Sequence, residues 1–178
     1  MKKIVIILAC ISISFLSFTE KEKEVAPHLD KTIVEIAAGN DNFSTLVATV
    51  KAAGLVDVLS GDNQFTVFAP TNAAFDKLPA GTVSTLLKPE NKQKLTDILT
   101  YHVVAGEFKA GDVLKAIKDN GGMFSVTTVK GEKITLMMDG KNVAIKDANR
   151  GKSIIVMTDV DASNGVIHAI ESVLMPKA

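Results

Sequence analysis

The stretch SNGVIHAIESVLMP, residues 163–176, decides the fold more than any other part of this sequence. Its Asn164-Gly165 dipeptide predicts a tight turn in which the glycine adopts a positive φ angle. The apolar run that follows predicts a buried strand. His168 alternates with apolar residues on one face of this strand, where a charged imidazole would be unfavourable. We therefore expect a neutral, hydrogen-bonded His168 that helps to specify the fold.

The chain has strand character from Met123 onward. The runs FSVTTV, KITLMM, NVAIKD and SIIVMTDVDA are rich in β-branched and apolar residues, and together with the final stretch they predict about five strands. Asp139-Gly140 is the strongest hairpin signal, and residues 130–133 are a second hairpin candidate.

The first half of the chain is mainly helical. Apolar residues recur at helical spacing in NFSTLVATVKAAG (42–54) and in NKQKLTDILTYH (91–102). DKTIVEIAAG (30–39) predicts a helix that is capped by Asp30 and stopped by Gly39. Shorter helices are expected at residues 55–61 and 111–122.

One strand interrupts these helices. QFTVFAP (64–70) is rich in β-branched and aromatic residues, and Pro70 ends it. Thr71 can cap a short helix over residues 72–78. Helices first and strands after predict an α+β domain, in which the early strand must join the late sheet beside the final strand.

Composition favours a single domain and argues against a nucleic-acid binder. The chain has 178 residues, 20 basic and 20 acidic residues and 47 % hydrophobic residues. Such a chain can bury a sizeable core, and it has no basic stripe for phosphates.

The first 19 residues resemble a secretory signal peptide, with Lys2 and Lys3 before an apolar run. Residues 20–29 predict a charged linker, and residues 30–176 the domain. Cys10 is the only cysteine. Its place within the apolar run favours a residue of the signal peptide over an acylated lipid anchor. The expected location is secreted, periplasmic or at the cell surface, without a membrane span in the mature chain.

Three separated stretches resemble the fasciclin domain family in the family's order. They are FTVFAPTNAAFDKL (65–78), LTYHVVAG (99–106) and DVDASNGVIHAIESVLMP (159–176). The resemblance implies a β-sandwich or wedge with a bundle of helices packed on one side. It also implies a non-catalytic module that mediates adhesion to a protein, matrix or polysaccharide partner, including in a bacterial biofilm.

The resemblance also suggests which residues matter. The family's adhesive segment corresponds here to Leu99, Tyr101, His102, Val103 and Val104. The structural motif corresponds to Thr71, Asn72, Phe75, Asn164, Gly165 and His168. The Asn-Lys-Asp triplet of integrin-binding members is not matched, since the nearest string is Asn91-Lys92-Gln93.

His102 has two interpretations. By spacing it lies on an apolar helical face, which favours a core histidine with satisfied ring nitrogens, and Thr71 and Asn72 are candidate partners. The alternative is a direct adhesive contact through Tyr101 and His102.

No catalytic, metal or cofactor site is predicted. The DVDASNG stretch fails as a calcium loop, because Asn164 stands at position 6 and Ile170 at position 12. A zinc site needs more ligands than His28, His102 and His168 clearly supply. A second function stays open: a periplasmic carrier of a small apolar ligand, which an enclosed pocket of several hundred Å³ would favour. An exposed apolar patch would favour adhesion.

Overall fold

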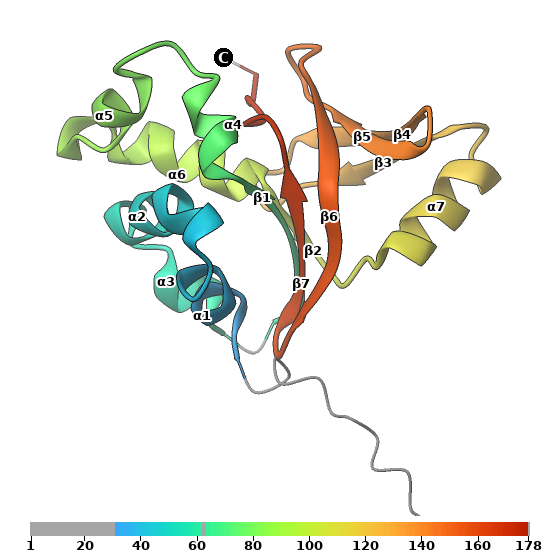
Figure 1. The fold of residues 1–178 in the computed structure, drawn as a ribbon, viewed down its shortest axis with the longest axis horizontal. Coiled ribbons are helices and arrows are strands. Elements are labelled where there is room, and N and C mark those ends of the chain that lie inside the picture. The colour runs from blue at the N-terminus through green and yellow to red at the C-terminus, as the bar shows by residue number, and fades with distance from the viewer. Residues whose placement is uncertain (1–30, 62, 178) are drawn as a thin grey trace, which may run out of the picture.

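The computed structural model describes residues 31–61 and 63–177 of the chain. The predicted signal and linker, Cys10, His28 and the predicted cap Asp30 lie outside these residues. Mixed helices and strands confirm the α+β class. The helical elements, shown in Figure 1, are α1 (Ile33–Ala38), η1 (Asp41–Phe43), α2 (Ser44–Ala53), α3 (Val56–Leu59), α4 (Asn72–Asp76), α5 (Thr82–Leu86), η2 (Pro89–Asn91), α6 (Lys92–Tyr101) and α7 (Ala110–Asp119).

The strands form one seven-stranded sheet in the described part of the chain, in the order β2-β1-β7-β6-β5-β4-β3. A single bridge between Val104 and Thr128 brings its two ends together, so that the sheet is close to a barrel. The strands are β1 (Phe65–Pro70), β2 (Val103–Ala105), β3 (Met123–Thr127), β4 (Lys133–Asp139), β5 (Asn142–Lys146), β6 (Lys152–Ala162) and β7 (Gly165–Ile170).

β1 and β7 lie side by side and run parallel, which confirms the expected place of the early strand beside the final one. All other neighbouring strands pair antiparallel. The Asp139-Gly140 hairpin is confirmed: Asp139 is opposite Asn142, and Gly140 has φ 63°. The second hairpin joins β3 to β4 through residues 128–132.

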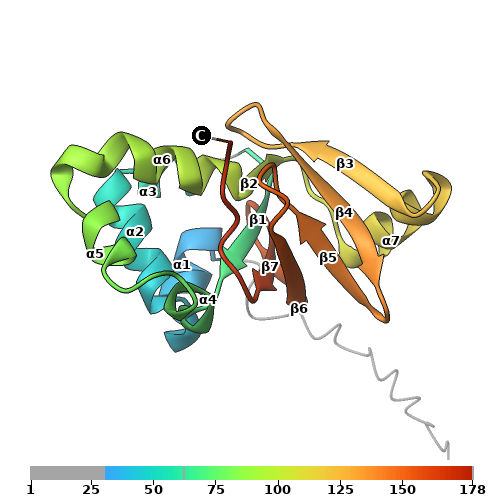
Figure 2. The ribbon, with the colours of Figure 1, turned by 90° about the horizontal axis from the view of Figure 1, so that it is seen from above.

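The β1–β7 pair separates two apolar cores. Ile167 and Ala169 of β7 face a core shared with helices α1, α2 and α6. Ile170 of β7 and Phe68 of β1 belong to a second core, which β3–β6 and α7 enclose. Figure 2 shows this arrangement, with α1–α6 on one side of β1 and β7, and with β3–β5 and α7 on the other. The expected helical bundle on one side of the sheet is therefore present.

Two local expectations differ from the structure. α1 is capped by Thr32, whose hydroxyl accepts from the Glu35 backbone while the Glu35 carboxylate accepts from the Thr32 backbone. This reciprocal capping box satisfies two free N–H groups at the helix start, which explains why the helix begins there. Thr71 does occupy the N-cap position of α4, but its side chain makes no capping hydrogen bond.

Candidate functional site

The Tyr-His segment lies where α6 turns into β2. Tyr101 is the last residue of α6, His102 is its C-cap, and Val103 begins β2. β2 pairs with β1 at one end of the sheet, next to the β1–β7 pair. The five residues of this segment are all buried, with at most 5 % of any of them exposed: Leu99, Tyr101, His102, Val103 and Val104.

Both ring nitrogens of His102 are hydrogen-bonded to the backbone. Nδ1 lies 2.8 Å from the carbonyl oxygen of Ile98, and Nε2 accepts from the N–H of Leu174 at 2.9 Å. Because Nε2 accepts, the proton must be on Nδ1, which donates to Ile98. Burial lowers the pKa of His102 to about 4, so the ring is neutral at pH 7.

These partners correct the expectation that Thr71 or Asn72 would satisfy His102. Leu174 lies 72 positions further along the chain, in the segment after β7, and no local pattern indicates that contact. His102 therefore ties the C-terminal segment to the end of α6.

Tyr101 joins two other parts of the sheet. Its hydroxyl donates to the carbonyl of Lys133 at 3.3 Å and accepts from the N–H of Ala148 at 2.9 Å. Burial raises the pKa of the Tyr101 phenol. The ring is completely buried, so a change of this residue disturbs packing as well as hydrogen bonding.

A side chain without exposed surface cannot touch a partner. In the folded structure the five segment residues present almost no surface to a partner. Their burial and their backbone hydrogen bonds agree instead with a structural role for Tyr101 and His102.

His168 is the second buried histidine, and its ring has the opposite tautomer. Nδ1 accepts from the N–H of Asp159 at 3.3 Å, so Nε2 carries the proton and donates to the carbonyl of Phe108 at 2.8 Å. The ring stacks on Phe68 with 5.7 Å between centroids. Burial lowers the pKa of His168. These contacts agree with the expected neutral core histidine.

Asn164 connects three elements at the turn between β6 and β7. Its side-chain oxygen accepts from the N–H of Ile33, at the start of α1. Its amide nitrogen donates to the carbonyls of Leu59 and Gly61, at the end of α3. Gly165 follows with φ 143°, and a Cβ at this position would lie 1.9 Å from the carbonyl oxygen of Phe65. The turn therefore requires both residues.

Asn72 acts on the helical side of the molecule. Its oxygen accepts from the N–H of Thr45 at 3.1 Å, and its nitrogen donates to the carbonyl of Asp41 at 2.8 Å. It thereby caps the first turn of α2 from a distant part of the chain. Phe75 is partly buried and packs against the helical core.

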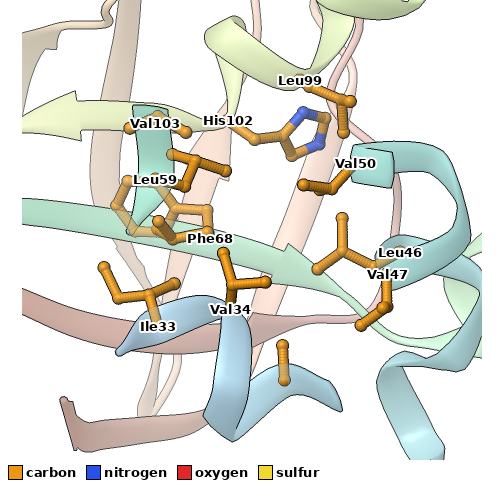
Figure 3. Close-up of a pocket in the computed structure, with 12 residues that line it drawn as sticks. Ile33, Val34, Leu46, Val47, Val50, Leu59, Phe68, Leu99, His102 and Val103 are labelled. Carbon is orange, nitrogen blue, oxygen red and sulfur yellow. The ribbon is translucent and has the colours of Figure 1, made fainter. Parts of the chain in front are cut away.

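The interior leaves little room for a ligand. A small apolar cavity of about 30 Å³ lies between the helices and β1, and Figure 3 shows its lining, with Leu99 and His102 on the α6 side. A drug-sized ligand needs about 300 Å³ or more. This cavity therefore offers no space for the apolar ligand of a carrier.

The arrangement gives no support to chemistry at either histidine. Both rings have both nitrogens engaged by backbone groups, so neither nitrogen faces a substrate. Among residues 31–61 and 63–177, no three His, Cys, Asp or Glu side chains are grouped to hold a metal ion. Over the same residues, no helix has the length and apolar character needed to cross a bilayer.

The buried residues of the three motif stretches surround the parallel β1–β7 pair and hold the elements around it together. The profile of the Fasciclin domain matches residues 41–176. The chain belongs to the fasciclin domain family, which is known from cell-adhesion and surface proteins.

Relatives of known sequence support this assignment. Protein sll1483 of Synechocystis sp. is 52 % identical over 82 % of this chain and 73 % of its own length. Immunogenic protein MPB70 of Mycobacterium bovis is 37 % identical over 80 % of this chain and 67 % of its own length. A FAS1 domain pair from the insect cell adhesion molecule Fasciclin I has the same fold, with a TM-score of 0.71 and 21 % identity over 82 % of this chain and 51 % of that one.

Proposed function

We propose that this chain is a secreted or surface-associated adhesion module that contacts a protein, matrix or polysaccharide partner without catalysis. The burial of the Tyr-His segment moves the expected contact surface away from Tyr101 and His102. The partner would then be bound through surface complementarity with the folded domain.

One observation supports adhesion over ligand transport. The interior cavity is about 30 Å³, whereas Met123 of β3 and Val156 of β6, which strand alternation places on the same face of the sheet, are each 56 % exposed. Contiguous exposed apolar surface is typical of interaction sites, and an enclosed cavity of several hundred Å³ is typical of carriers.

The test uses beads coated with the chain from Glu20 onward, which begins after the predicted signal. Adhesion of the beads to cells of the producing organism is compared with that of beads coated with an inert protein. We expect specific adhesion by wild type. In Tyr101→Phe and His102→Asn we expect adhesion to fall only as far as thermal stability falls, because these residues act through packing.

Two results would contradict the proposal. Adhesion no better than that of the inert protein removes the adhesive function. If Tyr101→Phe or His102→Asn loses adhesion while its melting temperature is unchanged, the Tyr-His segment is the contact surface.

A further inference from the structure

The outer face of the strands β3–β6 carries a continuous apolar row. Strand register places four residues next to one another across these strands, namely Met123, Met137, Ala144 and Ile154. Alternation directs the neighbouring residues of the same strands, such as Leu136 and Ile145, into the second core. Of the row, Met123, Met137 and Ile154 reach solvent, whereas the small side chain of Ala144 is buried.

The outer face stays open at both ends of this row. Met123 on β3 and Val156 on β6 are each 56 % exposed, while Met137 and Ile154 are partly exposed. Figure 2 shows helices α1–α6 on the far side of β1 and β7 from these strands. The helix α7 packs through Val113 and Ile117 into the core on the inner face of these strands.

Lysines flank the apolar row on one side. Lys146 of β5 and Lys152 of β6 are directly opposite each other, and Lys133 of β4 lies on the same outer face. Like charges in directly opposite positions destabilise a strand pair. Within the described residues Lys152 is paired with Asp139, while no carboxylate pairs with Lys133 or Lys146. Asp139 therefore compensates the charge of Lys152 and leaves those of Lys133 and Lys146 without a paired carboxylate among the described residues.

Charge is segregated toward this part of the chain. Residues 123–157 hold six basic and three acidic residues, and the rest of the described chain holds ten basic and twelve acidic residues. Of the three acidic residues, Glu132 and Asp139 are in ion pairs and Asp147 is buried. The outer face therefore combines exposed apolar side chains with excess positive charge.

We propose that the outer face of β3–β6 docks onto an anionic phospholipid surface. Acidic headgroups would neutralise Lys133, Lys146 and Lys152, and Met123 and Val156 would enter the interfacial region. A second copy of this chain would bring lysines against lysines on the same face. An acidic polysaccharide would satisfy the lysines and leave the apolar row in water. The inference rests on the proposed adhesive function and names a surface that would hold the module at a cell envelope.

The test is co-sedimentation of the chain from Glu20 onward with vesicles of phosphatidylcholine, pure or mixed with about 30 % phosphatidylglycerol. Removal of residues 1–19 keeps their apolar run from binding lipid. We expect binding to the anionic vesicles alone, and weaker binding when salt is raised from about 0.1 M to about 0.5 M.

Two double variants change one property of the face at a time. Lys133→Glu with Lys146→Glu is expected to lower the affinity for anionic vesicles at least about tenfold. Met123→Gln with Val156→Thr is expected to lower it about threefold by removing apolar contact. Matched controls on the helical side, Lys92→Glu with Lys94→Glu and Val58→Thr, should bind as wild type does. All variants must keep the wild-type circular dichroism spectrum and melt at or above the wild-type temperature.

Each remaining result overturns the inference. An equal loss of vesicle affinity in the helical-side controls would mean that binding depends on the net charge of the chain and not on the outer face. If the wild-type chain adheres to cells but does not bind anionic vesicles, the lipid proposal is wrong and the proposed adhesive function stands. Absence of both kinds of binding removes both proposals. Retention on an acidic polysaccharide that depends on Lys133 and Lys146 but not on Met123 and Val156 would replace the lipid by a glycan.

Discussion

The strand pair β1–β7 and the outer face of β3–β6 belong to one sheet but have opposite surroundings. Every residue of β1 and β7 is buried, because helices cover one face of this pair and the second core covers the other. The strands β3–β6 cover a core with one face and expose the other, where Met123 and Val156 remain more than half exposed.

The family resemblance lies in the first of these two regions and not in the second. The stretches 65–78, 99–106 and 159–176 supply β1, β2 and β7 with their buried hydrogen bonds. No residue of the outer face described above lies in any of these stretches. The motifs that identify the family therefore specify its fold, and the surface that could distinguish one member from another lies outside them. Substitutions in the β1–β7 region should therefore destabilise the fold more than substitutions on the outer face.

The largest expected effect is Gly165→Ala, at the start of β7. The added Cβ would lie 1.9 Å from the Phe65 carbonyl oxygen, which is backbone and cannot move without breaking the β1–β7 pairing. We expect a loss of more than about 4 kcal/mol, so that the chain does not fold. Gly140→Ala is the matched control in the β4–β5 turn, where φ is 63° and no atom lies within 4 Å of the new Cβ. It should cost about 1 kcal/mol, measured by urea denaturation. Similar losses in both variants would erase the contrast between the two regions.

Asn164→Ala should have the next largest effect. It removes three side-chain hydrogen bonds and leaves the Ile33 N–H and the Leu59 carbonyl buried without partners. We expect a loss of about 3 kcal/mol in the free energy of unfolding. Asn72→Ala removes a comparable set of bonds at a more exposed place, and should cost about 1 kcal/mol. Equal costs would show that burial is not what sets the value of these asparagines.

The two histidines predict how stability depends on pH. The folded protein keeps His102 neutral down to about pH 4, whereas the unfolded chain takes up a proton near pH 6.5. The unfolded state therefore binds more protons in this window, and stability falls as pH falls through it, by about 3 kcal/mol for His102. His168 acts in the same direction, since burial also lowers its pKa.

Urea denaturation at several pH values between 7 and 4.5 measures this loss. Nitrogen chemical shifts of the two rings provide the control, because His102 should show the Nδ1–H tautomer and His168 the Nε2–H tautomer. A ring that titrates near pH 6.5 in the folded protein would show that it is not held as the structure describes.

The sequence was sufficient for elements that carry a local pattern. Helical spacing predicted α2 and α6, and the Asp139-Gly140 turn predicted the β4–β5 hairpin. β2 was missed because Val103–Ala105 continues an apolar helical face for three residues and becomes a strand only by pairing with β1. α5 was missed because it is only five residues long and its two apolar contacts, Val83 and Leu86, are too few to show a helical period.

Long-range partners could not be predicted from the sequence. The apolar face of α6 indicated that His102 is buried, but its partner Leu174 depends on where the chain passes after β7. The row of Met123, Met137, Ala144 and Ile154 depends on the register of three strand pairs. Each of these residues alone is an ordinary member of a strand, so no sequence signal marks them as a set.

The smallest expected effect is on the outer face of β3–β6, and it is a gain in stability where the other substitutions cause a loss. Lys146→Glu replaces a like-charge pair with Lys152 by an opposite-charge pair across β5 and β6. We expect stability to rise by about 0.5 kcal/mol in low salt, with the gain reduced at high salt by screening. Lys133→Glu on the same face is the control, since its cross-strand partner is the uncharged Thr127, and its effect should be within about 0.3 kcal/mol of zero. Thermal melts at two salt concentrations measure both variants.

If Lys146→Glu gains stability while losing affinity for anionic vesicles, the repulsion on this face is maintained for binding at the expense of the fold. No stability gain would mean that Asp139 already compensates both lysines, and the outer face would then lose its main electrostatic argument.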